Sequence, residues 1–127
     1  MKIRVYYEDT DTGGVVYHSN YLNFCERARS DCFFKIGRTP ELENGHFVAK
    51  RINADYISPA KLGDELEIQT ELLEMKAASF ELRQTIYKNS KKIFVLDILL
   101  VYISFEGRPQ KLDASTKELL LSLFEGL

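Results

Sequence analysis

Acidic residues, a glycine pair and a histidine fall close together near the N-terminus of this chain. The group comprises Glu8, Asp9, Asp11, Gly13, Gly14 and His18. A helical pattern begins directly after the histidine, and the first N–H groups of a helix have no partners within it and carry the positive end of its dipole. Carboxylates held beside such a helix start indicate a site where a carbonyl group is polarised and attacked.

Each of these residues also has a purely structural explanation. An aspartate such as Asp9 or Asp11 is favoured in a glycine-containing turn, because its side chain bonds to nearby backbone groups. His18, one of two histidines in the chain, is by itself only a residue at a helix start. Tyr7 falls on the inward face of a predicted strand, where it either packs in the core or turns its hydroxyl toward the site.

A strand is predicted before the glycines and a long helix after them. Residues 2–8 alternate between apolar and polar types, which is typical of a half-buried strand. Residues 19–36 then follow helical spacing, and their wide apolar stripe, with Arg29 as its polar exception, requires other elements to wrap around it. The residues that define the two elements are Ile3, Val5 and Tyr7 on the inward strand face, Ser19 or Asn20 as the helix cap, and Gly37 as the helix stop.

Four further strands follow the helix. The last two form a predicted hairpin around residues 89–92. If Asn89 faces Lys92, then Gln84 lies opposite Asp97 in an otherwise apolar face. That polar pair is either mutually hydrogen-bonded or leaves Asp97 to meet water. The four predicted strands span residues 47–57, 64–75, 79–88 and 93–105.

The last strand is apolar on both of its faces. The predicted register leaves one face unpartnered, with Phe94, Leu96, Ile98 and Leu100 on it. A strand of this kind is usually covered on both sides, and one helix covers only one. The second cover is either another subunit or the final segment, residues 113–127. That segment contains a Ser115-x-x-Glu118 capping-box pattern ahead of a leucine stripe.

Composition and periodicity together predict one α+β domain over residues 1–127, with one long helix against about five mostly antiparallel strands. An apolar content of 45% argues against disorder, and a net charge of −2 provides no basic field for nucleic acid. The start of the chain lacks a signal-peptide pattern, and the apolar run 93–105 is too short to span a bilayer. We therefore expect a soluble cytoplasmic protein.

The cysteines and histidines predict neither a disulfide nor a metal site. Cys25 and Cys32 are seven positions apart on the predicted helix, so their Cα atoms lie roughly 10 Å apart, beyond the reach of a disulfide. We expect free thiols that pack in the core. His18 and His46 lie in different segments with no cysteine or carboxylate at ligand spacing, so no metal is expected.

A long signature runs through the first part of the chain. It reads Tyr7-Glu8-Asp9-Thr10-Asp11, then Gly14-Val15-Val16-Tyr17-His18-x-Asn20-Tyr21-Leu22 and Glu26-x-Ala28-Arg29, and it continues in Tyr56-x-x-Pro59-Ala60 and Leu66-Glu67-Ile68. These segments closely resemble the signature of YbgC-type acyl-CoA thioesterases, within the 4-hydroxybenzoyl-CoA thioesterase class of hotdog-fold enzymes. The resemblance implies a hotdog fold, in which a five-stranded antiparallel sheet wraps around one long helix and a short C-terminal helix follows. It also implies homodimers whose sheets join edge to edge, often paired into homotetramers.

The resemblance also assigns roles in the site. Asp11 aligns with the carboxylate that attacks the thioester or activates a water, and both routes stay open. The backbone N–H groups of Tyr17 and His18 would polarise the thioester carbonyl. The imidazole of His18 would orient Asp11 or assist the leaving thiolate, and the hydroxyl of Tyr7 would bond to the site.

Coenzyme A would enter as part of the substrate, so no separate cofactor is expected. In this class its phosphates lie near surface basic residues, and a basic run precedes a Ser-Phe pair. Here only Lys76 precedes Ser79-Phe80. The other candidates for the nucleotide contacts are Arg51, Lys61, Lys91 and Lys92.

The resulting expectation is a thioester hydrolase that converts acyl-CoA to free acid and coenzyme A. One alternative is that the acyl group arrives on acyl carrier protein, an acidic partner that would need a basic rim around the site. The other is a non-catalytic hotdog protein that binds acyl chains or acts as a scaffold linked to the Tol–Pal envelope system.

Overall fold

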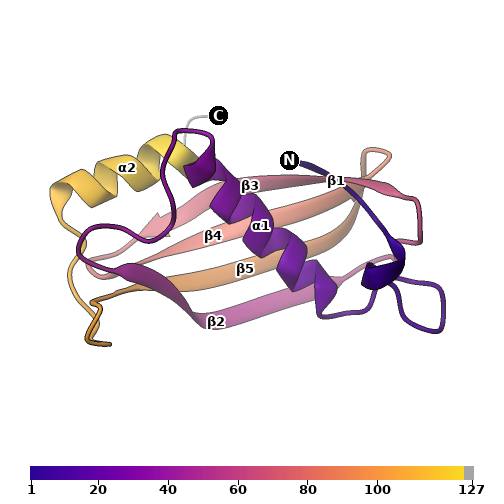
Figure 1. Cartoon of the computed structure of the whole chain (residues 1–127), viewed down its shortest axis with the longest axis horizontal. Coiled ribbons are helices and arrows are strands. Elements are labelled where there is room, and N and C mark those ends of the chain that lie inside the picture. Colours follow the sequence, from indigo (N-terminus) through magenta and orange to yellow (C-terminus); the bar gives the residue numbers. More distant parts are fainter. Residues whose placement is uncertain (125–127) are drawn as a thin grey trace.

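The computed structural model describes residues 1–124. Five antiparallel strands form one sheet in the order β1-β3-β4-β5-β2, and the long helix α1 lies across one of its faces (Figure 1). The predicted α+β arrangement is therefore confirmed. In chain order the elements are β1 (Lys2–Arg4), the 3-10 turn η1 (Tyr7–Asp9), α1 (Asn20–Phe34), β2 (His46–Tyr56), β3 (Glu65–Met75), β4 (Ser79–Lys88), β5 (Lys91–Ile103) and α2 (Ala114–Phe124).

Helix α1 forms where the helical spacing predicts it. It begins after Ser19, whose side chain makes no capping hydrogen bond, so this cap differs from the expected one. The helix ends at Phe34, and Gly37 in the turn that follows adopts a φ of 74° that favours glycine. There the N–H of Arg38 donates to the carbonyl of Phe33 at 3.0 Å. The buried residues of the helix pack on the sheet and are Tyr21, Phe24, Cys25, Ala28 and Phe33.

The register of the β4–β5 hairpin differs from the predicted one. Its turn contains only Asn89 and Ser90, with φ values of 50° and 64°, as a two-residue hairpin turn requires. The strands therefore extend to the turn, and a bulge follows between Ile86 and Tyr87. As a result Arg83, and not Gln84, lies opposite Asp97. A shift of one residue exchanges the two faces of a strand.

The exchanged faces change what is buried. Phe94, Leu96, Ile98 and Leu100 face α1 in the core, where the predicted register left them unpartnered. Gln84 also faces the core and is fully buried. Asp97 lies on the outer face of the sheet, where Arg83 donates to its carboxylate from Nε and Nη2 at 2.8 and 2.9 Å.

The first strand is shorter than its alternating pattern predicts. It ends at Arg4, and the chain turns into η1, where Tyr7 is 82% exposed instead of facing the core. Local bonds compete with the ladder here, because the carboxylate of Asp9 accepts the N–H of Tyr6 at 2.9 Å.

Helix α2 lies on the β3 side of the molecule beside the end of α1 (Figure 1). The ring of Phe124 packs against Phe33 and Phe80, so α2 closes one end of the core. Its start is capped by Asp113, which accepts the N–H of Thr116 at 2.8 Å, in place of the predicted Ser115 box.

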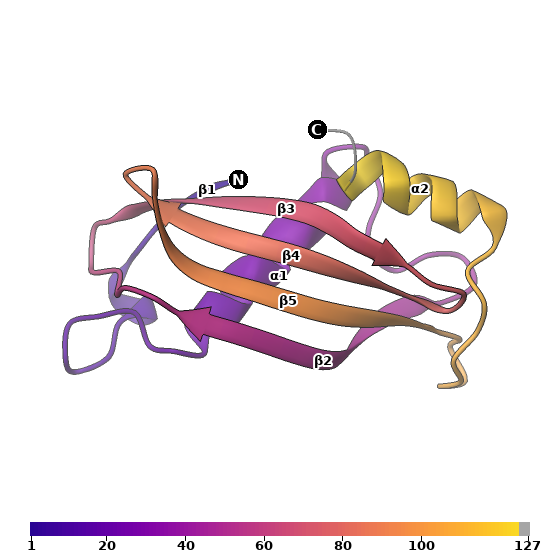
Figure 2. The ribbon, with the colours of Figure 1, turned by 180° about the vertical axis from the view of Figure 1, so that it is seen from behind.

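Seen from behind, no described helix crosses the outer face of β4 and β5 (Figure 2). Within residues 1–124, Val95 and Val101 of β5 are partly exposed on this face, whereas Leu99 between them is buried. The described part of α2 is therefore not the second cover of the sheet, and residues 125–127 of the predicted final segment lie outside the described part of the chain. None of the described helices is long and apolar enough to cross a membrane.

Candidate active site

Asp11 lies at the tip of a narrow hairpin formed by residues 10–16. Thr10 pairs with Val16 across it, and the N–H of Asp11 donates to the carbonyl of Val15 at 2.9 Å. One carboxylate oxygen of Asp11 accepts the N–H of Gly13 at 2.8 Å, which is the turn-forming role expected of an aspartate. Its other carboxylate oxygen makes no hydrogen bond with residues 1–124, and the side chain is exposed to solvent.

The backbone at the start of α1 offers one of the two predicted donors. The N–H of Tyr17 is not available, because it donates to the carbonyl of Asp9 at 2.9 Å. The carbonyl of Tyr17 accepts the N–H of Asn20 and therefore points into the helix. Because N–H and C=O point in opposite directions in a trans peptide, the N–H of His18 points away from the helix. It has no hydrogen-bond partner in the described part of the chain.

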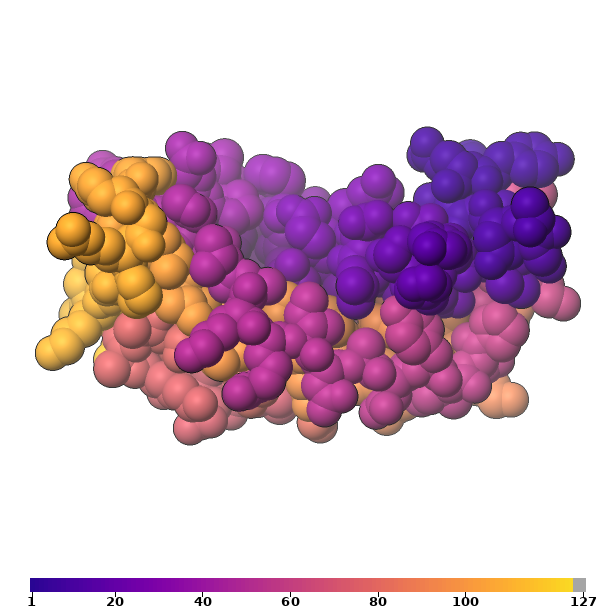
Figure 3. Space-filling model, turned by 90° about the horizontal axis from the view of Figure 1, so that it is seen from below, coloured from indigo at the N-terminus to yellow at the C-terminus, as the bar shows by residue number. Residues whose placement is uncertain are grey.

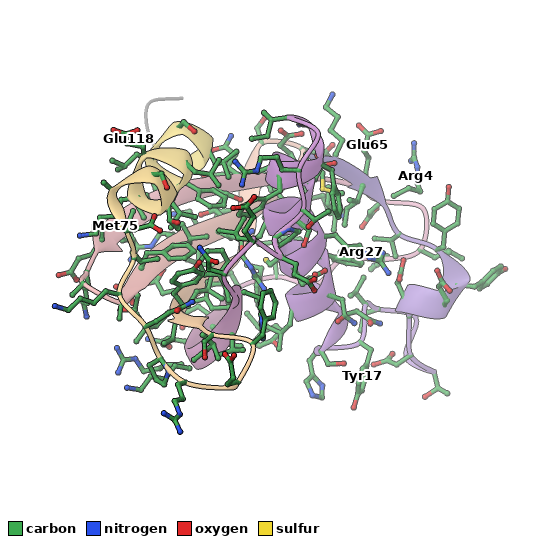
Figure 4. All side chains as sticks on the ribbon, turned by 60° about the vertical axis from the view of Figure 1, so that its left-hand side comes forward. Arg4, Tyr17, Arg27, Glu65, Met75 and Glu118 are labelled. Atoms are coloured by element: carbon green, nitrogen blue, oxygen red, sulfur yellow. The ribbon has the colours of Figure 1, made fainter. Side chains whose placement is uncertain are left out.

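His18 lines a cleft of about 210 Å³. The hydroxyl of Tyr56, at the end of β2, donates to the carbonyl of His18 at 2.8 Å and fixes the peptide on the far side of the same residue. The ring of His18 packs against that of Tyr17, with 4.4 Å between centroids, and Tyr17 lies beside the start of α1 (Figure 4). The residues lining the cleft are Val16, His18, Tyr21, Tyr56, Ile57, Ser58 and Pro59.

The predicted catalytic residues therefore divide into two groups. His18 lines the cleft, whereas Asp11 lies on the hairpin that borders it through Val16. Tyr7 is exposed on η1 and lines no part of the cleft, so its predicted inward position is wrong.

A polar link that the sequence reasoning missed joins the hairpin to the helix. The side-chain amide of Asn20 donates to the carbonyl of Asp9 at 2.9 Å, so this one carbonyl receives both Asn20 and the N–H of Tyr17. Asp9 is buried, and its carboxylate accepts the N–H of Tyr6 within the η1 turn. Asn20 appeared in the sequence only as a cap and as part of the signature, because the backbone atom that it binds is eleven positions away.

We expect Asn20→Asp to lower kcat for thioester hydrolysis about tenfold while changing KM little, because a small misplacement of reacting groups is costly. The substitution conserves shape but replaces the donor to the carbonyl of Asp9 with an acceptor. Steady-state kinetics of both parameters provide the measurement. Asn89→Asp, in the exposed hairpin turn, is the matched control. An unchanged kcat in Asn20→Asp would show that the link does not position the site.

The four residues predicted to contact coenzyme A do not come together within one chain. Lys61 lies beside the Asp11 hairpin, where it pairs with Val15. Lys76 and Ser79 lie at the other end of β3, about 33 Å away along the strand. Arg51 is exposed on β2, opposite Leu99 of β5. The alternative candidates Lys91 and Lys92 follow the β4–β5 turn.

The cysteines take no part in the site. Both are free thiols, as predicted, and Cys25 is fully buried. Burial raises the pKa of the Cys25 thiol to about 12, so it stays protonated and unreactive at neutral pH. Within residues 1–124, no three potential metal ligands of the histidine, cysteine, aspartate or glutamate type lie together.

The family model of the thioesterase superfamily matches residues 13–94, which include His18, α1 and the cleft residues. The chain belongs to the thioesterase superfamily. Asp11 lies two positions before the matched stretch of this superfamily member. The hotdog fold that the signature implies is confirmed by the family and by the solved structures of similar shape.

Several proteins similar to this superfamily member are named as acyl-CoA thioesterases. The acyl-CoA thioesterase YbgC of Helicobacter pylori is 55% identical over 87 residues, and the match covers 68% of this chain but only 65% of that protein. The long-chain acyl-CoA thioesterase FadM of Escherichia coli is 31% identical over 125 residues, covering 94% and 90% of the two chains. The structure of a thioesterase from Thermus thermophilus complexed with coenzyme A and zinc superposes with a TM-score of 0.82, at 26% identity and 93% coverage of each chain.

Proposed function

We propose that this protein hydrolyses acyl-CoA thioesters to a free carboxylic acid and coenzyme A. The observation that carries the proposal is that His18, whose N–H has no partner within residues 1–124, lines a cleft near the start of α1. A backbone donor at a helix start suits the oxygen of a carbonyl that gains negative charge. Relatives named as acyl-CoA thioesterases support the choice of substrate.

In this mechanism the thioester oxygen accepts the N–H of His18, and Asp11 supplies or activates the nucleophile. By one route a carboxylate oxygen of Asp11 attacks the carbonyl carbon, the C–S bond breaks to release thiolate, and water hydrolyses the resulting anhydride. By the other route Asp11 takes a proton from water, the hydroxide attacks, and the thiolate leaves and is protonated. In both routes the imidazole of His18, which lines the cleft, would assist the departure of the thiolate.

The test is release of free thiol from short-chain, long-chain and aromatic acyl-CoAs. We expect turnover of at least one class, with equal amounts of acid and coenzyme A formed. Hydrolysis of acyl carrier protein thioesters alone would mean that the carrier is acyl carrier protein and not coenzyme A, with the same thioester hydrolysis. Tight binding of acyl-CoA without hydrolysis of any substrate would contradict the proposal and favour a non-catalytic acyl-binding or scaffold protein.

We further propose a homodimer joined through the β2 edges, paired through the outer sheet faces into a homotetramer. β2 is an edge strand of 11 residues that exposes Val48, Ile52 and Tyr56, and long exposed edges of this kind favour pairing with another chain. The partly exposed Val95 and Val101 on the outer face of β5 support the second contact. Light scattering of the purified protein is expected to give the mass of a dimer or tetramer, and a monomer at micromolar concentration would contradict this assembly.

A further inference from the structure

Arg29, the polar exception on the apolar stripe of α1, lies half-buried between the helix and the sheet. Its Nη1 donates to Oε1 of Gln84 at 3.0 Å. It makes no ion pair with any carboxylate in residues 1–124. A guanidinium has five N–H donors, so most of its bonding capacity is unused by these residues.

The one partner of this cation is neutral and is itself fixed. The amide nitrogen of Gln84 donates to the carbonyl of Cys25 at 2.8 Å and to the hydroxyl of Thr70 at 3.1 Å, so the amide oxygen is left to face Arg29. Burial lowers the pKa of Arg29. The exposed carboxylate of Glu26 attracts this cation but forms no ion pair with it, so an anion bound directly beside the guanidinium would remove part of the cost of withdrawing it from water.

A pocket of about 110 Å³ opens next to the guanidinium. Its walls are mainly apolar, and they include the aromatic residues Phe33, Phe47, Phe80 and Phe124. The remaining charged group at the pocket is Glu26, whose carboxylate accepts the hydroxyl of Ser30 at 3.0 Å at the exposed rim. The pocket thus combines apolar walls with one incompletely bonded cation.

This pocket and the cleft of the candidate active site are both lined by residues of α1 and β2. Asn20, at the start of α1, and Arg29 are about 14 Å apart along the helix at a rise of 1.5 Å per residue, and His18 lies two positions before Asn20. Figure 3 looks onto the β2 edge and shows a recess between α1 and β2, with atoms of β5 visible inside it. Ile52 of β2 is exposed on this edge, between Tyr56 at the cleft and Phe47 at the pocket. A long acyl group held at His18 would therefore direct its far end toward Arg29.

We propose that Arg29 binds a carboxylate at the far end of the acyl group, so that the favoured substrates are ω-carboxyacyl-CoA thioesters. This inference rests on the proposed thioesterase function. A planar carboxylate matches the fork of a guanidinium in two parallel bonds, and it is small enough for the pocket. An unsubstituted acyl chain would contact the apolar walls but leave the guanidinium without a directly bound anion.

The test compares pairs of saturated acyl-CoAs of equal carbon number, with and without an ω-carboxyl group, over a series of chain lengths. For the native protein we expect kcat/KM to favour the ω-carboxyl substrate about tenfold or more at the length that reaches Arg29, as a charge-assisted hydrogen bond allows. Arg29→Gln should lower that ratio at least tenfold, whereas Arg29→Lys should retain part of it. Arg27→Gln is the matched control, because Arg27 is exposed and projects outward from the same helix (Figure 4).

Equal kcat/KM for the two substrates at every length in the native protein would overturn the inference, as would an unchanged ratio in Arg29→Gln. If Arg29→Gln does not fold, free dicarboxylic and monocarboxylic acids of equal length serve as competing inhibitors of the native protein. Stronger inhibition by the dicarboxylic acid supports the inference, and equal inhibition overturns it. Absence of hydrolysis of all thioesters would instead contradict the proposed function itself.

Discussion

Asp11→Asn is expected to lower kcat for acyl-CoA hydrolysis by roughly 10²- to 10⁴-fold, the usual contribution of a positioned acid–base group. The substitution leaves a carbonyl oxygen able to accept the N–H of Gly13, so the hairpin tip retains its turn. The amide has neither the charge to attack a thioester nor the basicity to deprotonate water. The effect should therefore appear in kcat, with KM and the thermal unfolding temperature little changed.

Thiol release with a saturating acyl-CoA provides the measurement for Asp11→Asn. Asp55→Asn is the matched control, since Asp55 is an exposed aspartate on β2. Turnover close to that of the native protein would remove Asp11 from the mechanism and leave His18 and a free water as the chemical groups of the cleft.

The second large effect is expected at Gln84. Gln84→Leu should lower the free energy of unfolding by about 3 kcal/mol, because it leaves buried polar groups, one of them charged, without their partner. These groups are the guanidinium of Arg29, the carbonyl of Cys25 and the hydroxyl of Thr70. The leucine side chain is apolar and similar in size, so the loss would not come from a large cavity.

Urea denaturation followed by circular dichroism measures this change. Gln69→Leu, at an exposed position on the neighbouring strand β3, is the control and should change the free energy of unfolding by less than about 0.5 kcal/mol. Equal stability of Gln84→Leu and the native protein would mean that the buried polar bonds contribute no net stabilisation.

The periodic parts of the fold could be predicted from the sequence. The helix predicted over residues 19–36 is α1, and the strand predicted over 79–88 is β4 without any change of boundary. These elements repeat a pattern over many residues, so single exceptions such as Arg29 do not obscure them. The hairpin register could not be obtained in this way, since it depends on the positive φ values of Asn89 and Ser90 and not on periodicity.

The candidate site could be predicted only as far as the signature extends. It identified His18, which lines the cleft, and it directed attention to Asp11, whose catalytic role stays a prediction. It did not reveal that the N–H of Tyr17 is used by the fold, or that Tyr56 holds the carbonyl of His18 from 38 positions away. Hydrogen bonds between distant segments have no pattern within either segment.

The bond from Gln84 to the carbonyl of Cys25 has a consequence for how α1 is oriented. Apolar contacts are non-directional, so an apolar helix face packed on an apolar sheet is compatible with several rotations of the helix about its own axis. A directional hydrogen bond to one main-chain oxygen selects a single rotation of the helix. Arg29 lies on this helix, and His18 lies two positions before its first residue. A rotation of the helix about its axis would therefore displace both the cleft at His18 and the pocket at Arg29. The hydrogen bond from Gln84 opposes that rotation.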